Sequence, residues 1–361
     1  MIPHNKPTIG EEEIRSVGEV IRNHWLVPGT KTKEFENIFC KYIGLPEGRG
    51  VALSSGTAAL YVALKVLEIG GGDEVIIPTY VCSSLLNAVY MAQAKPVIVD
   101  IKEKDFNISL AEIKAKINNR TKAVIVPHMF GVPADTILMR EELEIPIIED
   151  CATAIGSRID EKYLGTLTDI GMFSFYASKV IATGQGGMLV SNNVDHVEKA
   201  RDYIDFDLGK GKKRGKRPFY PRFNFETTDI QSALGTSQFS KIEMLLDKRK
   251  QISEAYQEIC NVKGWDFQKP AKDNFYPNYY RFVVKSDNQT INDLQAYLKK
   301  HDIETIIPIE NWELLHNYLE LNKKDFRIAE KVSNETLSLP AYPNLIKEGN
   351  LEKIINIIEK F

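Results

Sequence analysis

Short apolar runs rich in β-branched residues alternate with segments of helical periodicity through the first two-thirds of the chain. The expected strands are Gly50–Leu53, Glu74–Ile77, Pro96–Val99, Ala123–Val126, Pro146–Ile148, Ile170–Phe175 and Met188–Val190. The expected helices between them lie near 57–68, 83–92, 109–117 and 134–143. Continuous apolar strands separated by helices are typical of a parallel sheet covered on both faces. The pattern therefore predicts an α/β fold with a large, mostly parallel sheet of seven strands.

The pattern changes after about residue 235. The elements expected there are a long helix over Ile230–Cys260, a strand at Tyr280–Val284, a helix near 291–300 and a helical tail at 347–360. Fewer strands and longer helical stretches indicate a smaller α+β domain. We therefore expect a large domain over residues 1–235 and a small C-terminal domain over residues 236–361.

Composition and charge narrow the class of protein. Hydrophobic residues make up 43% of the chain, charged residues 26%, and the net charge of −3 gives no reason to expect binding to nucleic acid or to an acidic membrane. The four cysteines, at 40, 82, 151 and 260, are scattered and match neither a zinc site nor a disulfide framework, so no metal is expected. The chain has no signal-peptide core and no apolar run of bilayer length, and a cytoplasmic location is expected.

A dense cluster of basic residues occupies positions 209–217. Its members are Lys210, Lys212, Lys213, Arg214, Lys216 and Arg217. Such a run is either a solvated loop or a flap that binds the phosphates of a nucleotide substrate. The interspersed glycines do not complete a P-loop or a dinucleotide-binding motif.

A single lysine, Lys179, follows the apolar run that ends at Ser174 and precedes a glycine-rich turn at 184–187. Its neighbours are aromatic or small, and burial among such residues disfavours the charged ammonium. A neutral amine can form a Schiff base with an aldehyde cofactor or a carbonyl substrate. The alternative is that Lys179, like most lysines, is a solvated surface charge.

Other expected strands also end at residues that can bind a ligand, and ligands of open parallel sheets lie at the carboxyl ends of the strands. The run Ser54–Ala58 opens a helix whose N–H groups and hydroxyls can bind an anion, although an ordinary N-cap explains the run as well. Asp150 ends another strand and, once buried, needs a cation or hydrogen-bond donors; helix capping is the alternative. His128 is either a ligand contact or a hydrogen-bonded structural histidine.

Pyridoxal 5′-phosphate (PLP) is one ligand that would use all these groups together. Its phosphate would lie at Gly56, Thr57 and Ser174. Its pyridine nitrogen would pair with Asp150 and stay protonated there, and its aldehyde would react with Lys179. Each match is weak alone, but their order along the chain favours a PLP site.

The chain resembles the DegT/DnrJ/EryC1/StrS sugar aminotransferases, which have the aspartate-aminotransferase type of PLP fold (fold type I). The motifs that carry the resemblance are IGEEEI (9–14), SSGTAAL (54–60), GDEVIIP (72–78), PVIVDI (96–101), TKAVIVPHMFG (121–131), IIEDCATAIG (147–156), FSFYASK (173–179), GQGGM (184–188), FNFETTDIQSALG (223–235) and LSLPAYP (337–343). They span nearly the whole chain.

The resemblance implies roles for particular residues. Lys179 would form the internal aldimine, and Asp150 would pair with the pyridine nitrogen. The residues that match the family's phosphate ligands are Gly56, Thr57 and Ser174. Asn224 is similar to the asparagine that reaches the phosphate of the neighbouring subunit, which implies a homodimer with shared active sites.

Two positions depart from the family pattern. An aromatic residue usually stacks on the cofactor ring four residues after the proline that ends the strand, and here that position is Cys82, with Tyr80 two residues earlier. Either Tyr80 supplies the stacking face or the Cys82 thiol packs against the ring. The second departure is Thr153, in place of a common glutamine; its shorter side chain still offers a hydroxyl to the cofactor's phenolic oxygen.

The expected reaction transfers an amino group from an amino acid, with glutamate as the expected donor, to a keto sugar, with PLP alternating with pyridoxamine phosphate. A nucleotide-linked keto-deoxysugar, for surface-polysaccharide or natural-product amino sugars, is the expected acceptor. The alternatives are a non-nucleotide ketone such as a cyclitol, a PLP-dependent sugar dehydratase, and a non-catalytic regulatory relative. Dehydratases of this fold have histidine in place of the Schiff-base lysine, so Lys179 argues against them. Candidate substrate contacts are Trp25, His128 and Arg222.

Overall fold

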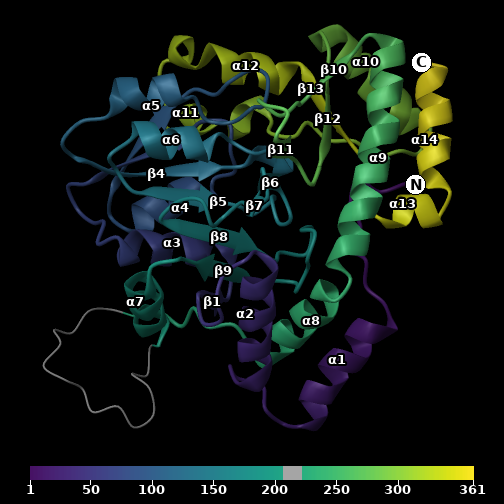
Figure 1. Cartoon of the computed structure of the whole chain (residues 1–361). Coiled ribbons are helices and arrows are strands. Elements are labelled where there is room, and N and C mark those ends of the chain that lie inside the picture. Colours follow the sequence, from purple (N-terminus) through teal and green to yellow (C-terminus); the bar gives the residue numbers. More distant parts are fainter. Residues whose placement is uncertain (206–221) are drawn as a thin grey trace, which may run out of the picture.

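The computed structural model describes residues 1–205 and 222–361, and its largest element within them is a seven-stranded sheet (Figure 1). The basic cluster at 209–217 lies outside the described residues. In spatial order the strands are β1 (Gly50–Leu53), β9 (Gly187–Val190), β8 (Ile170–Ser174), β5 (Ile147–Asp150), β4 (Thr121–Pro127), β2 (Glu74–Pro78) and β3 (Lys95–Val99). β9 is antiparallel to both of its neighbours, and all other pairs are parallel. The predicted α/β fold with a mostly parallel sheet is confirmed.

Helices cover both faces of this sheet. They are α2 (Thr30–Tyr42), α3 (Gly56–Val66), α4 (Ser84–Met91), α5 (Leu110–Lys116), α6 (Thr136–Glu142) and α7 (Val194–Ile204). Alternate strand residues point to opposite faces. In β4, Ile125 packs into the core that includes α3, α4 and α7, whereas Val124 and Val126 pack with α5 and α6 on the other face. Burial on both faces explains why the strands are continuous apolar runs.

The helix expected over 230–260 is two helices, α8 (Asp229–Phe239) and α9 (Ile242–Lys263), so that expectation is wrong. The break falls at Ser240 and Lys241, where Lys241 leaves helical geometry and its ammonium pairs with the buried carboxylate of Glu13, 2.7 Å away. The two helices have different neighbours. α8 packs with α2 and with α1 (Glu11–Arg22), whereas α9 runs along one side of the molecule to the C-terminal elements (Figure 1).

The C-terminal elements form a smaller α+β unit. Its sheet contains β10 (Asp266–Phe267), β12 (Phe282–Lys285) and β13 (Thr336–Leu339), all antiparallel. The remaining helices are α10 (Asn288–Lys300), α11 (Leu315–Tyr318), α12 (Arg327–Asn334), α13 (Asn344–Lys347) and α14 (Asn350–Glu359). β12 starts two residues later than the strand expected at Tyr280–Val284. The helical tail expected at 347–360 is interrupted at Gly349, which has the left-handed backbone conformation.

Segments from both ends of the chain cross between these units. Ile2 forms a β-bridge with Ile303 and is buried in the core of the C-terminal unit. Conversely, Leu315 and Phe326 are buried in the core beside α3 and α4. A third small sheet joins β6 (Arg158–Ile159), β7 (Lys162–Tyr163) and β11 (Phe275–Tyr276). The boundary at residue 235 stays a prediction, since residues on both sides of it share cores.

Within residues 1–205 and 222–361, no helix has both the length and the apolar composition needed to cross a membrane.

The start of α2 depends on a residue two hundred positions away. Gly29, its N-cap, has no side chain to bind the free N–H groups of the first turn. The buried Asp229 accepts hydrogen bonds there instead, from Gly29 N at 2.8 Å, Lys31 N at 3.3 Å, and both the N–H and the hydroxyl of Thr32 at 2.9 and 2.8 Å. α2 is therefore capped only when α8 has packed against it.

Asp229→Ala should therefore strongly destabilise the protein. Loss of a charged cap with several donors should lower the free energy of unfolding by about 2–4 kcal/mol. Thermal unfolding followed by circular dichroism should show a midpoint about 3–5 °C lower. Asp195→Ala, which removes an exposed acid from the first turn of α7, is the control and should change the midpoint by less than about 1 °C. Equal effects of the two substitutions would contradict this account of α2.

Candidate active site

The carboxyl ends of β1, β4, β5 and β8 lie at one edge of the sheet, because these four strands are parallel to one another. Four of the residues that the sequence singled out are at these ends. Gly56 follows β1, His128 follows β4, Asp150 ends β5 and Ser174 ends β8. The turn that leaves β8 then carries Lys179. The topology thus gathers residues that are more than a hundred positions apart in sequence.

A site suited to an anion lies where α3 begins. The Ser55 hydroxyl caps the helix by accepting from Ala58 N at 3.1 Å, and Gly56 and Thr57 form its first turn. A Cβ at Gly56 would lie 2.9 Å from the Cβ of Ser174, so only glycine lets the helix end approach β8 this closely. The positive end of α3 and the hydroxyls of Thr57 and Ser174 are therefore close together, as phosphate binding requires.

Asp150 is a buried carboxylate at the centre of this edge, with 6% of its surface exposed. Its Oδ1 accepts from Ala152 N at 2.9 Å. Burial raises the pKa of Asp150, and the Ala152 N–H and the charge of Lys179 only partly oppose that rise. A cationic partner would remove the cost of ionising this group.

Lys179 lies in the turn between β8 and β9 and is half-buried. Its backbone N–H donates to Tyr176 O at 2.8 Å, which closes the turn. Its Nζ lies 5.2 Å from the centroid of the Tyr280 ring, and its charge acts on Asp150. The structure therefore brings an amine and a buried carboxylate together beside the anion site.

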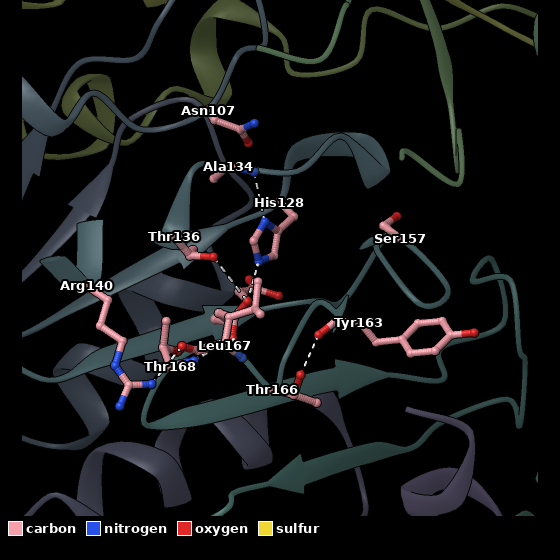
Figure 2. A network of polar contacts seen from close by, with 12 residues as sticks. Asn107, His128, Ala134, Thr136, Arg140, Ser157, Tyr163, Thr166, Leu167 and Thr168 are labelled. Carbon is pink, nitrogen blue, oxygen red and sulfur yellow. Dashed lines mark hydrogen bonds and ion pairs between the residues drawn. The ribbon is translucent and has the colours of Figure 1, made fainter. Parts of the chain in front are cut away.

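His128 has a structural environment. Its side chain is fully buried; Nδ1 accepts from Ala134 N at 3.0 Å, so Nε2 carries the proton and donates to Glu149 Oε1 at 3.2 Å (Figure 2). The other donors to Glu149 are Thr136 Oγ1, Leu167 N, Thr168 N and Thr168 Oγ1. Both ring nitrogens are thus used within the protein. This argues against the expected contact of His128 with a substrate.

The two candidates for the face above a cofactor ring have different environments. Tyr80 is fully buried, and its ring meets the edges of Phe106 and Phe130 with centroids 6.0 and 6.2 Å apart. Cys82, two residues on, is exposed. Burial in the core argues against Tyr80 as the stacking residue, which leaves Cys82 as the candidate.

Thr153 is close to the site, but its hydroxyl already has a partner. Thr153 Oγ1 donates to His128 O at 3.0 Å, so its proton is used within the protein and only its lone pairs remain for a ligand. A direct hydrogen bond from this hydroxyl to a cofactor oxygen would require that contact to break.

The remaining predicted residues lie at the periphery. Trp25, between α1 and α2, is 58% exposed. The Arg222 side chain is largely buried and pairs with Asp202, with Nη2–Oδ2 at 3.1 Å and Nε–O at 3.0 Å. Asn224 is exposed, beside Phe225, whose carbonyl accepts from Ser54 N at 2.8 Å. The segment that carries Asn224 therefore runs past the end of β1.

Sequence reasoning gave no site role to several residues that the structure places here. Tyr280, Asn278 and Asn5 contact the turn of Lys179 or the loop after Asp150. They come from the C-terminal unit and the N-terminal segment, and no motif in a single sequence marks them. Only their packing identifies them.

Comparison with known proteins agrees with this geometry. The chain matches the model of the DegT/DnrJ/EryC1/StrS aminotransferase family over residues 7–359. An uncharacterised protein of Methanocaldococcus jannaschii is 33% identical, over 99% of this chain and 97% of that protein. The GDP-perosamine synthase of Escherichia coli O157:H7 is 30% identical, over 96% of this chain and 95% of the relative. Among solved structures, the aminotransferase TlmJ from Streptoalloteichus hindustanus is 29% identical with a TM-score of 0.91, covering 99% of this chain and 98% of TlmJ.

The fold and these relatives define a PLP-dependent aminotransferase of fold type I. The chain belongs to the DegT/DnrJ/EryC1/StrS aminotransferase family, as its motifs predict. The residues present fit the cofactor chemically. The start of α3 suits a phosphate, the buried Asp150 suits a protonated ring nitrogen, and Lys179 supplies an amine.

Asp150→Asn should stabilise the cofactor-free protein while weakening its hold on PLP. Because burial raises the pKa of Asp150 in the folded state, ionising it costs stability as the pH rises through that pKa. The neutral amide avoids this cost. The unfolding midpoint of the cofactor-free variant should be about 2 °C above wild type at neutral pH, and the gain should shrink as the pH falls.

Thermal unfolding at several pH values, with and without PLP, measures both effects. Asp273→Asn, at an exposed position, is the matched control and should not change the midpoint in either state. A cofactor-free Asp150→Asn protein that is no more stable than wild type would contradict the assignment of a buried, unpaired carboxylate.

Proposed function

We propose that this enzyme transfers the amino group of glutamate to a keto sugar carried on a nucleotide. The observation that carries the proposal is that Lys179 lies where its charge acts on the buried Asp150, at the same sheet edge as the start of α3. The sugar acceptor is supported by the relatives, among them GDP-perosamine synthase and a spore coat polysaccharide biosynthesis protein of Bacillus subtilis.

Each residue at the sheet edge has a defined part in this proposal. Lys179 would bind PLP through its amine, and the same amine would move the proton at the donor's Cα. Asp150 would keep the ring nitrogen protonated. PLP, when bound, would supply the electron sink for the transfer. The residues that hold the phosphate are Gly56, Thr57 and Ser174.

We also infer a homodimer in which each active site takes residues from both subunits. Asn224 is exposed, and its apolar neighbour Phe223 is 43% exposed. Trp25 and Val27, both 58% exposed, form another apolar surface between α1 and α2. Apolar surface of this kind supports an interface between subunits. In the proposed dimer, Asn224 of one subunit binds the cofactor phosphate in the active site of the other subunit.

The acceptor's phosphates require positive charge. Arg222 is a weaker candidate than the sequence suggested, because Asp202 already neutralises its guanidinium. The basic residues at 209–217, which lie outside the described part of the chain, are the other candidates by their charge. Neutral substitutions there should raise the KM for a nucleotide sugar more than for a sugar phosphate, if they bind the nucleotide.

The amino-group transfer can be followed by absorbance. The purified, PLP-loaded protein should have a visible or near-ultraviolet band that shifts when glutamate is added without an acceptor. A 3-keto or 4-keto nucleotide sugar added next should restore the starting spectrum and yield an amino sugar, because the two half-reactions are separate. A panel of such sugars, with a cyclitol ketone included, identifies the acceptor by product analysis.

Lys179→Ala should abolish both spectral changes, with kcat lower by at least about 10³-fold. Lys162→Ala, at an exposed lysine of β7, is the control and should behave as wild type. Full activity of Lys179→Ala, or a wild-type protein that neither binds PLP nor responds to any amino donor, would overturn the proposed function.

Hybrid dimers test the shared site. Lys179→Ala and Asn224→Ala subunits should each be weak alone, but their hybrid contains one site with both native residues. Random mixing of equal amounts should therefore restore about a quarter of the wild-type activity. The control mixes Lys179→Ala with the double variant, which cannot form a native site. If the first mixture is no more active than the Asn224→Ala protein it contains, Asn224 does not act across subunits.

A further inference from the structure

A short segment of the C-terminal half, Asn278–Arg281, crosses to the active site. Asn278 is buried, and its amide donates to the carbonyls of Thr153 at 3.1 Å and Ile155 at 2.8 Å. Its backbone N–H donates to Ser157 Oγ at 3.0 Å. Asn278 therefore holds the loop that follows Asp150.

The next residue, Tyr279, has an unusual backbone conformation. Its φ is +46°, in the left-handed region that bulky residues rarely adopt. The side chain of Asn278 stabilises this turn by accepting from Tyr280 N at 2.9 Å. Strained conformations persist where the surroundings fix them, and they concentrate at functional sites. Here the reversal at Tyr279 turns Tyr280 towards the turn of Lys179.

Tyr280 contacts this turn in two ways. Its ring lies beneath the Lys179 ammonium, 5.2 Å from Nζ to the ring centroid, and its hydroxyl donates to Ser178 Oγ at 3.3 Å. Asn5 adds a hydrogen bond to the same turn, from Nδ2 to Ser178 O at 2.7 Å. Tyr280 is itself fixed, because Arg249 Nη1 donates to its carbonyl at 3.0 Å. The tyrosine side chain is 5% exposed and has little freedom to move.

We propose that Tyr280 is a positioning residue for Lys179, with the ring supporting the lysine amine and the hydroxyl fixing the residue before it. The inference rests on the proposed role of Lys179 in the transfer. Its physical basis is that a cation over an aromatic face is held at a preferred distance and angle. An amine that must alternate between holding a cofactor and moving a proton gains from such support, since misplacement slows the reaction.

The pKa of the Tyr280 phenol reports on the contact between Tyr280 and Lys179, because charged groups surround this side chain. Burial by itself raises the pKa of the Tyr280 phenol, but Lys179, Arg281, the Ser178 hydroxyl and Arg249 lower it, and the net shift is downward. His4, which lines a small cavity with Tyr280 and Arg281, has its pKa lowered by burial to about 3 and stays neutral. Lys179 is therefore one of three cations that favour the phenolate, and its removal should raise the phenol pKa.

The first test uses the cofactor-free protein. The tyrosinate absorbance of wild type minus that of Tyr280→Phe, measured against pH, isolates the titration of Tyr280. In a Lys179→Met background the same difference should move to higher pH, by about one unit. Lys269→Met is the matched control, since Lys269 also lies over a ring, that of Phe267, but not over Tyr280. An unchanged Tyr280 titration in Lys179→Met would overturn the proposal.

The second test uses the PLP-loaded enzyme and separates positioning from general structure. Tyr280→Phe keeps the ring and should lower kcat by about threefold, whereas Tyr280→Leu should lower it by about tenfold or more. The KM for glutamate should stay within about twofold, because the donor's binding groups are unchanged. The control, Tyr276→Leu, removes a ring that faces Arg158 and should leave kcat unchanged.

A purely structural role would give a different result. Tyr280→Leu would then lower the thermal midpoint and the fraction of protein that binds PLP, with kcat per bound PLP and its pH profile unchanged; that outcome would overturn the proposal. The titration does not depend on turnover. It therefore tests whether Lys179 and Tyr280 interact even if the wild-type protein aminates none of the keto sugars used.

Discussion

The buried carboxylate of Glu149 holds together the sheet edge on which the active site is built. It receives five hydrogen bonds from donors on three segments, which is what a fully buried anion needs to remain stable. His128 is among these donors, and its backbone N–H also donates to Asp150 O at 3.1 Å. Successive strand residues point to opposite faces, so Asp150 lies on the face opposite Glu149, where the charge of Lys179 acts on it. The neighbouring carboxylates thus differ in environment: Glu149 accepts five hydrogen bonds within the chain, whereas Asp150 Oδ1 accepts one from Ala152 N.

The chemistry and the support of the site come from different parts of the chain. Asp150 ends a strand of the large sheet and Lys179 lies in the turn between two of its strands, whereas Tyr280 reaches Lys179 from the C-terminal half. A second connection joins Thr79, just before Cys82, to His316. The Thr79 hydroxyl accepts from His316 N at 3.1 Å and donates to its Nδ1 at 2.7 Å. The loops that carry candidate cofactor contacts are therefore held by side chains outside the large sheet.

Much of the fold was predictable because burial on both faces requires apolar strands, and such runs are visible in a sequence. The break between α8 and α9 was not, since the apolar periodicity continues across Ser240 and only the separate partners of the two helices reveal it. The same holds for Asp229, which caps a helix two hundred residues away. The sequence left Tyr80 and Cys82 as alternatives for the face above the cofactor ring, because an aromatic residue near a strand end suits a core as well as a ligand. Phe106 and Phe130 beside Tyr80 decide for the core.

The amino-acid sequence is enough to predict the strands of the large sheet, the family, and the presence of an amine, a carboxylate and a helix start suited to PLP. These follow from residue types and local spacing, which do not depend on distant contacts. The folded arrangement instead decides which groups remain available to a ligand. It buried Asp150 with the Ala152 N–H as a hydrogen-bond donor, used both nitrogens of His128 within the protein, and turned Tyr280 beneath Lys179. Whether a polar side chain is free to react depends on neighbours that are remote in sequence, and folding alone brings them together.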